Sequence, residues 1–179
     1  PGMTVFAPSS YQELQQMLHD ALEITSGPVA IRYPKTAAPS VGEDEVGHGV
    51  RGRKSRTGDE VCVLAVGKML AAAQQAADRL ADEGISCSVW DVRSVTPLDP
   101  AMLDDAATHR LVVTIEDGIR DGGCGSAIRD RLSELDDCPE TIRVLGVPLE
   151  HVPHAGADQI LAELGLDADG IMETIRANR

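Results

Sequence analysis

The segment of residues 111–135, LVVTIEDGIRDGGCGSAIRDRLSEL, constrains the fold of this chain more than any other stretch. It begins with five apolar or β-branched residues, which is the length and composition of a buried strand. Four glycines follow within residues 118–125, and then Ile128, Leu132 and Leu135 recur at helical spacing, which predicts a helix that begins near Ser126. Strand, glycine-rich loop and helix in this order are typical of α/β sheets, whose binding crevices open beyond the carboxyl ends of the strands.

The glycine-rich loop, residues 118–125, matches neither of the common nucleotide-binding patterns. A P-loop has Lys directly after its last Gly, whereas Ser126 follows Gly125 here. A dinucleotide fingerprint has its glycines directly after the strand, whereas Gly123 and Gly125 come well beyond it. We therefore assign the glycines to turns with positive φ and to close packing against a neighbouring segment.

Predicted strands and helices alternate regularly after residue 59. The apolar patterns predict strands at residues 61–66, 87–92, 111–115 and 141–145, and helices at residues 69–80, 99–107, 126–135, 158–164 and 169–177. This alternation predicts an α/β fold with a mainly parallel sheet and helices on both faces.

The first 38 residues have the pattern of a helix followed by a short strand. Ser10 and Glu13 form a capping box at the start of an amphipathic helix. Residues 29–31 are strand-like, and Pro34 ends this strand because it cannot donate to a ladder. The chain also opens on Pro1 and enters a strand-like stretch at once, which suggests a cut within a larger protein.

Between these parts, residues 36–59 are rich in Gly, Pro, Ser and charges and have no apolar periodicity. They predict a linker, with room for a hairpin. The basic cluster in it, Arg51, Arg53, Lys54 and Arg56, is interpreted as a solvated face. The expected organisation is therefore two folding units, at residues 1–38 and 59–179, joined by a linker at residues 39–58.

Composition excludes several classes of function. A net charge of −13 and an aromatic content of 2% argue against a nucleic-acid partner. No apolar run is long enough to span a membrane, and no secretory signal opens the chain. The four cysteines are far apart in sequence and form no metal knuckle or disulfide framework, so we expect a reducing cytoplasm.

Arg32 is the strongest candidate for a binding residue. An Arg at the end of a strand, with Lys35 nearby, can present a forked donor to a carboxylate or a phosphate. Spacing alone favours a structural ion pair over a ligand contact at this position.

Glu116 and Asp117 could form an acid/base pair, but adjacent residues of an extended chain point to opposite faces. We therefore favour capping of the loop or pairing with Arg120. Cys124 would be reactive only if a helix N-terminus lowered its pKa. Lys68 follows a Gly but lacks the upstream Gly of a P-loop.

His151 and His154 have the spacing of a metal pair, yet Pro153 breaks the helix that would align their rings. No third ligand follows them in sequence. Taken by themselves, the residues form no complete catalytic constellation and no metal site.

Several sequence strings, in order along nearly the whole chain, carry a family resemblance. They are APSS (residues 7–10), GPVAIRYPK (27–35), DVR (91–93) with PLD (97–99), VTIED (113–117) with GG and GS (122–123 and 125–126), LGVP (145–148), and ELGLD (163–167) with GI (170–171). Together they resemble the carboxy-terminal part of the 1-deoxy-D-xylulose-5-phosphate synthase family in the transketolase superfamily.

The resemblance implies a thiamine-diphosphate- and magnesium-dependent enzyme that condenses pyruvate with D-glyceraldehyde 3-phosphate and releases CO2. Its product feeds isoprenoid, thiamine and pyridoxal biosynthesis. Residues 1–38 would end the pyrimidine-binding domain, and residues 59–179 would be the transketolase carboxy-terminal domain of a homodimer. The Arg of the RYP string holds the substrate phosphate in that family, which gives this role to Arg32. The chain departs from the pattern at Thr36, where the family has Gly.

The family's GDG motif, activating Glu and catalytic histidines have no counterpart in this chain. We therefore expect no catalytic, cofactor-binding or metal-binding residue here, and no thiamine diphosphate bound by this chain alone. The partners would be the remaining domains of the same enzyme. Two alternatives stay open: the equivalent region of another transketolase-like or 2-oxoacid dehydrogenase β-type enzyme, and a stand-alone non-catalytic assembly module.

Overall fold

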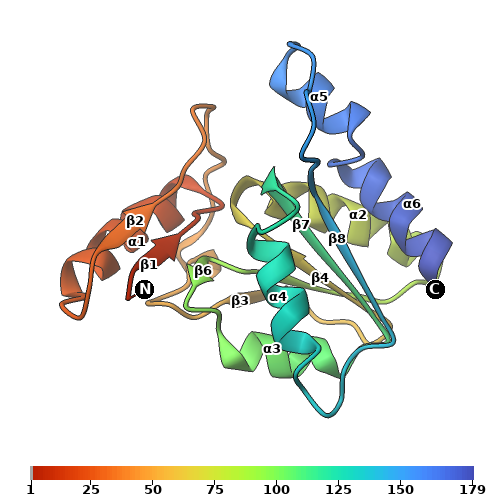
Figure 1. Ribbon diagram of the computed structural model, residues 1–179, viewed down its shortest axis with the longest axis horizontal. Helices are drawn as coiled ribbons and strands as arrows, with labels where there is room; N and C mark the ends of the chain where they lie inside the picture. The colour runs from red at the N-terminus through yellow and green to blue at the C-terminus, as the bar shows by residue number, and fades with distance from the viewer. Residues whose placement is uncertain (1) are drawn as a thin grey trace.

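The structure, a computed structural model, describes residues 2–179 and is built around a five-stranded sheet (Figure 1). The strand order is β3-β5-β4-β7-β8. The strands are β3 (Arg53–Arg56), β4 (Val61–Ala65), β5 (Cys87–Asp91), β7 (Leu111–Ile119) and β8 (Thr141–Val147). β4, β5, β7 and β8 pair in parallel, and β3 is an antiparallel edge strand. The mainly parallel sheet predicted from sequence is confirmed.

Helices cover both faces of this sheet (Figure 1). On one face, α2 (Leu70–Asp82) and α6 (Ala168–Asn178) pack against the odd-numbered residues of β4. On the other face, α3 (Pro100–Ala107) and α4 (Cys124–Leu132) pack against the even-numbered ones. α5 (Ala157–Glu163) lies between β8 and α6 in sequence. No helix within residues 2–179 is both long and apolar enough to cross a bilayer.

A second, three-stranded sheet joins the N-terminal segment to the rest of the molecule. It has the order β2-β1-β6, from β1 (Thr4–Phe6), β2 (Val29–Ile31) and β6 (Ser94–Thr96). β1 and β2 are parallel and flank α1 (Tyr11–Glu23) in sequence, whereas β6 follows β5 and pairs antiparallel with β1. Sequence patterning misses β6 because three residues carry too little periodicity to read.

The predicted linker contains regular structure, namely the 3-10 helix η1 (Glu43–Glu45) and the edge strand β3. Two of its basic residues bind helices on opposite faces of the sheet: Lys54 pairs with Asp105 of α3 at 2.8 Å, and Arg56 pairs with Asp78 of α2. The interpretation of this basic cluster as a solvated face is therefore wrong for these two residues. The acidic partners lie far away in sequence, so the charge pattern alone could not reveal them.

A buried ion pair connects α1 to the residue after β5. Arg93 Nε lies 2.7 Å from Glu13 Oε2, and both side chains are fully buried. The Arg93 guanidinium also donates to the carbonyl oxygens of Gly49 and Arg51, at 2.9 and 2.6 Å. Glu13 Oε1 in turn accepts the backbone N–H of Gly47 at 2.7 Å. Charges removed from water require such partners, so this network fixes α1 and residues 47–51 against the larger sheet.

Replacing Glu13 by Gln is expected to lower the free energy of unfolding by about 3 kcal/mol, because it leaves the Arg93 charge buried without its closest carboxylate. Urea unfolding followed by circular dichroism measures this loss. Glu23→Gln is the control, because Glu23 lies on the same helix but is exposed. Equal stability of the two variants would contradict a structural role for the buried pair.

Asp91, at the end of β5, is a second buried carboxylate at this junction. The Ser9 hydroxyl donates to its Oδ2 at 2.5 Å, whereas Oδ1 has no hydrogen-bond partner within residues 2–179. Burial raises the pKa of Asp91 to about 7; the Ser9 hydrogen bond opposes this rise, and the nearby Glu13 charge adds to it.

This raised pKa makes the stability of the chain depend on pH. Between pH 4 and pH 7 the folded state holds a proton that the unfolded state has lost, so the free energy of unfolding should fall as pH rises through this range. Asp91→Asn should remove that dependence, with a relative gain above pH 7 of up to about 4 kcal/mol. Urea unfolding at several pH values, with the exposed Asp130→Asn as control, measures the difference. A difference that does not change with pH would contradict the assignment.

Candidate functional site

The side chain of Arg32 lies directly after β2 and contacts β7 of the larger sheet. Its Nη1 lies 2.6 Å from Asp117 Oδ1, and its Nη2 donates to the Asp117 carbonyl oxygen at 3.1 Å. The backbone N–H of Arg32 donates to the Phe6 carbonyl at 2.8 Å, which anchors the base of the side chain to β1. The end of one sheet and the end of the other therefore meet at this ion pair.

A second cation, Lys68, completes the cluster. It belongs to the 3-10 helix η2 (Gly67–Met69) after β4, and its Nζ lies 3.6 Å from Asp117 Oδ2. Each carboxylate oxygen of Asp117 thus faces a different cation. We call Arg32, Lys68 and Asp117 the cation cluster; its formal charge is 2 − 1 = +1.

The cation cluster is open on the side of Arg32. The Arg32 side chain is 49% exposed, against 14% for Asp117 and 23% for Lys68. A guanidinium has five N–H donors, and two of them are used here, so 5 − 2 = 3 have no partner in the described part of the chain. Arg32 therefore forms the ion pair that its spacing favours and also keeps donors available for an anion from solvent.

Glu116 points away from the cation cluster. It accepts the backbone N–H groups of Cys124 and Gly125 at 3.2 and 2.8 Å, and so caps the N-terminus of α4. Burial raises its pKa above the usual value, although these two hydrogen bonds oppose the rise. Glu116 and Asp117 are therefore no acid/base pair, and capping by Glu116 is confirmed. The alternative pairing with Arg120 is wrong, because Arg120 pairs with Asp121.

The glycine-rich loop has the structural role predicted for it. Gly122 has a φ of +83°, a conformation that side chains disfavour. A Cβ at Gly123 would lie 2.5 Å from Glu116 Oε1, and one at Gly125 would lie 2.3 Å from Thr114 Oγ1. The small residues therefore let α4 begin directly against β7, where Glu116 can reach its N–H groups.

The remaining candidates are separate from the cation cluster. The Cys124 thiol is buried, and this burial, with the Glu116 charge, raises its pKa to about 12, so it is not activated. His151 and His154 are exposed in the loop between β8 and α5. Lys35 is exposed and has no ion-pair partner within residues 2–179.

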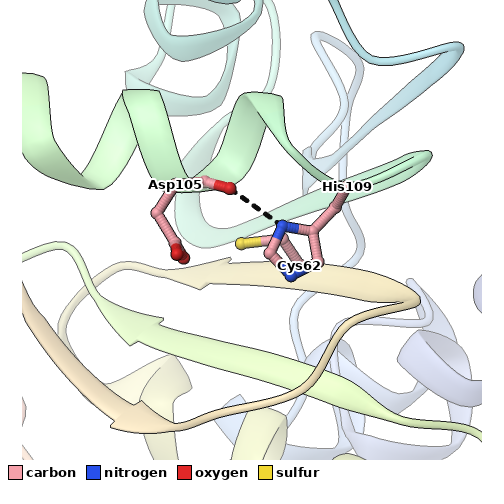
Figure 2. Close-up of side chains that lie close together, drawn as sticks. All are labelled: Cys62, Asp105 and His109. Carbon is pink, nitrogen blue, oxygen red and sulfur yellow. Dashed lines mark hydrogen bonds between the residues drawn. The ribbon is translucent and has the colours of Figure 1, made fainter.

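Sequence reasoning missed one group of potential ligands, Cys62, Asp105 and His109 (Figure 2). Their ligand atoms lie within 4.8 Å of one another, between β4 and the end of α3. The four-residue spacing of Asp105 and His109 was the only sequence signal, because Cys62 lies in an apolar strand.

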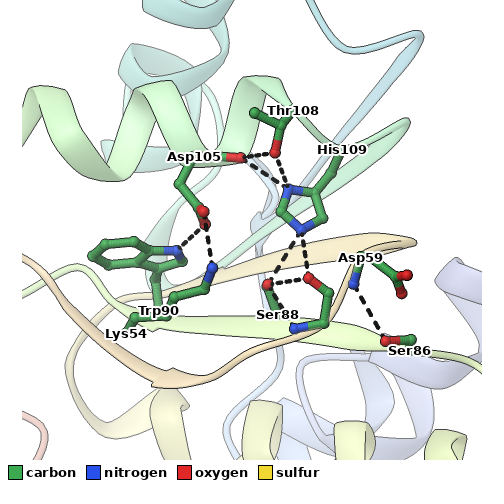
Figure 3. A network of polar contacts seen from close by, with 9 residues as sticks. Lys54, Asp59, Ser86, Ser88, Trp90, Asp105, Thr108 and His109 are labelled. Atoms are coloured by element: carbon green, nitrogen blue, oxygen red, sulfur yellow. Dashed lines mark hydrogen bonds and ion pairs between the residues drawn. The ribbon is translucent and has the colours of Figure 1, made fainter.

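These three residues do not fit a metal ion, because their donor atoms are already engaged (Figure 3). Asp105 binds Lys54 Nζ at 2.8 Å and accepts the Trp90 indole N–H at 2.7 Å. The two His109 ring nitrogens lie 2.9 and 3.2 Å from the carbonyl oxygens of Asp105 and Gly58. Burial raises the pKa of Cys62, whereas a metal needs the thiolate. The group instead ties α3 to β3 and β5.

The chain is similar in sequence to known proteins of one family. Residues 51–171 match the family model described as "Transketolase, C-terminal domain". The chain is 39% identical to the 1-deoxy-D-xylulose-5-phosphate synthase of Magnetococcus marinus, over 98% of the chain and 29% of that protein. It is 41% identical to the same enzyme of Synechococcus sp. (strain JA-2-3B'a(2-13)), over 99% of the chain and 28% of that protein. The chain thus spans less than a third of the length of these relatives.

A solved structure has the same fold. The chain titled "Split gene transketolase, inactive beta4 tetramer" superposes with a TM-score of 0.91 at 31% sequence identity. The match covers 99% of the present chain and 58% of the other one. Both the fold and the family resemblance expected from sequence are confirmed.

Proposed function

The chain belongs to the transketolase C-terminal domain family, and on that premise we propose that it is the carboxy-terminal part of a 1-deoxy-D-xylulose-5-phosphate synthase. The complete enzyme would use thiamine diphosphate to condense pyruvate with D-glyceraldehyde 3-phosphate, with release of CO2. Identities of 39–41% to synthases over nearly the whole chain, against 31% to the split-gene transketolase, support this choice.

Within that enzyme, Arg32 would bind the phosphate of D-glyceraldehyde 3-phosphate. The observation that carries this proposal is the half-exposed guanidinium, which is held on one side by Asp117 and keeps three donors open. Arginine is suited to this role because its fork matches phosphate geometry and remains charged. A phosphate held away from the reacting carbon provides binding energy that orients the aldehyde.

The side chains of residues 2–179 do not fit the magnesium ion that accompanies the cofactor. The one group of three His, Cys, Asp or Glu ligands within residues 2–179 is occupied by protein donors and by the ammonium of Lys54. A magnesium ion prefers oxygen ligands, which this group could supply only from Asp105. We therefore assign binding of thiamine diphosphate, and the chemistry at it, to other parts of the enzyme.

The N-terminal part offers a surface for those other parts. Leu18 and Leu22 of α1 are 54% and 85% exposed, and β2 pairs only with β1 in its sheet. Residues 1–38 would be the last helix and strand of the pyrimidine-binding domain, whose remainder would cover these groups. Residues 59–179, after the linker of residues 39–58, would form the carboxy-terminal domain and contribute to a homodimer. The cysteines, all free and three of them buried, accord with a cytoplasmic enzyme.

Similarity to the split-gene transketolase supports a second candidate function. A chain that closely resembles this one in fold is part of a protein whose title describes a split gene and a β4 tetramer. By analogy, the present region could belong to a separately encoded subunit of another transketolase-like enzyme. The two candidates differ in substrate: a synthase consumes pyruvate, and a transketolase transfers a ketol group between sugars.

In the complete enzyme, Arg32→Ala is expected to lower kcat/KM for D-glyceraldehyde 3-phosphate by roughly 30- to 1,000-fold, equivalent to about 2–4 kcal/mol for a lost charged contact. The KM for pyruvate should stay nearly unchanged, because no phosphate is involved in its binding. Steady-state kinetics with each substrate varied in turn measures both values. Arg110→Ala, at an exposed ion pair with Glu140, is the control. Equal losses for both substrates would show that Arg32 is structural.

Isothermal titration of residues 1–179 with thiamine diphosphate and Mg²⁺ is expected to show no micromolar binding, because the one cluster of potential ligands found within residues 2–179 is already engaged by protein groups. The complete enzyme, titrated in the same buffer, is the positive control. Micromolar binding to the isolated chain would contradict the assignment of the cofactor to other domains.

A further inference from the structure

We propose that Asp117 is the positioning residue for Arg32, and that Lys68 in turn holds Asp117. This inference rests on the phosphate-binding role proposed for Arg32 and extends it to the carboxy-terminal domain. Arg32 and Asp117 are 85 positions apart; Arg32 directly follows β2 of the smaller sheet, and Asp117 belongs to β7 of the larger one. The orientation of the substrate contact would therefore be set by a domain that contributes no group to the reacting atoms.

The geometry of the pair suits orientation. Asp117 engages Arg32 twice, through its carboxylate at 2.6 Å and its carbonyl oxygen at 3.1 Å, so both terminal nitrogens are fixed. Two contacts to different nitrogens of one planar group restrict its rotation as well as its position. A half-exposed Arg without them would sample several rotamers, which a ligand would have to restrict on binding.

The position of Asp117 is itself determined by its neighbours. It lies near the end of β7, where Glu116 is held on the opposite face by the N-terminus of α4. Its second carboxylate oxygen faces Lys68 Nζ at 3.6 Å, on the segment directly after β4. Both supports lie next to the parallel sheet, because α4 follows β7 and packs on it and η2 directly follows β4.

Asp117 is not needed to hold the N-terminal segment against the larger sheet, because other contacts do so. The buried Glu13–Arg93 pair and the pairing of β1 with β6 connect the N-terminal segment to the larger sheet. An ion pair with one half-exposed partner adds little to such a junction, because solvent screens it. Loss of Asp117 should therefore affect the orientation of Arg32 far more than the stability of the protein.

The electrostatic effect of removing Asp117 on phosphate affinity is opposite to the effect expected from the loss of Arg32 orientation. Asp117 neutralises part of the positive field around Arg32 and Lys68, so its removal would strengthen binding of a phosphate if orientation did not matter. The field effect is screened by salt, with a Debye length of about 8 Å at physiological ionic strength, whereas the loss of orientation is not. Affinity for the phosphate and its salt dependence therefore distinguish the two effects.

The test uses the complete enzyme with Asp117→Asn, and with D-glyceraldehyde 3-phosphate and unphosphorylated D-glyceraldehyde as alternative acceptors. We expect the KM for the phosphorylated acceptor to rise about 10-fold, with kcat nearly unchanged, because binding to ground state and transition state is lost alike. The KM for the unphosphorylated acceptor should stay the same. The rise should persist at high salt, and the melting temperature should change little.

Two further single variants of the cation cluster, one double variant and one control sharpen the test. Asp117→Glu keeps the charge and should recover most of the affinity, and Lys68→Met should give a smaller rise of about 3-fold in the same KM. In an Arg32→Ala background, Asp117→Asn should have no further effect, because its only route to the phosphate is removed. Glu140→Gln, at an exposed ion pair elsewhere, is the control for loss of a surface carboxylate.

The outcomes separate this inference from the proposed function. A lower KM for the phosphorylated acceptor in Asp117→Asn, or equal changes for both acceptors, would overturn the positioning role. If Arg32→Ala weakens phosphate use and Asp117→Asn does not, the positioning role fails while the function stands. If Arg32→Ala has no effect on the phosphorylated acceptor, the phosphate-binding role of Arg32 itself fails.

Discussion

The fully buried guanidinium of Arg93 determines how the two parts of this molecule meet. A charge removed from water must have partners, and Arg93 obtains them from Glu13 of α1 and from the carbonyl oxygens of Gly49 and Arg51. The carbonyl of Arg93 also accepts the N–H of Ala7, which fixes the end of β1. These contacts place the N-terminal segment against the larger sheet, so β2 ends where β7 can reach it. The meeting of Arg32 with β7 therefore depends on this junction.

The contact between Arg32 and Asp117 also requires the length of β7. The strand continues for four residues beyond Ile115, where an apolar run would suggest that it ends, and its register with β8 shifts in this extension. Extended backbone alternates its side chains, so Glu116 turns to α4 and Asp117 turns to Arg32. Two adjacent carboxylates thereby serve different purposes: one caps α4, and the other connects β7 to the residue that follows β2.

The sequence predicts the parts of this fold that rest on local patterns. The apolar runs locate β4, β5, β7 and β8, and the Asp99-Pro100 pair marks the start of α3. The sequence patterns do not predict β3 and β6, because the residues of these strands are polar or few. Both strands pair with partners far away in sequence. Arg32 could be identified as a candidate from its place after a strand, but its partner Asp117 could not. No local rule connects residues 85 positions apart, and only the assembled fold brings them together.

The net charge of the chain is negative, whereas that of the cation cluster is positive. The distance of each charge from a phosphate at Arg32 would determine how strongly it acts on that phosphate. The chain carries a net charge of −13, which would repel an anionic substrate if it acted as a whole. Charges more than about 8 Å away are largely screened at physiological ionic strength, so mainly nearby groups would act on a phosphate at the proposed site. Arg32, Asp117 and Lys68 are joined by direct contacts and form the cation cluster of charge +1. The carboxylate of Glu116 also acts on Arg32 electrostatically, although it is hydrogen-bonded to the N-terminus of α4. An acidic surface and a local cationic site are therefore compatible, provided that the cations are held in place, and in this fold the carboxylate of Asp117 contacts both of them.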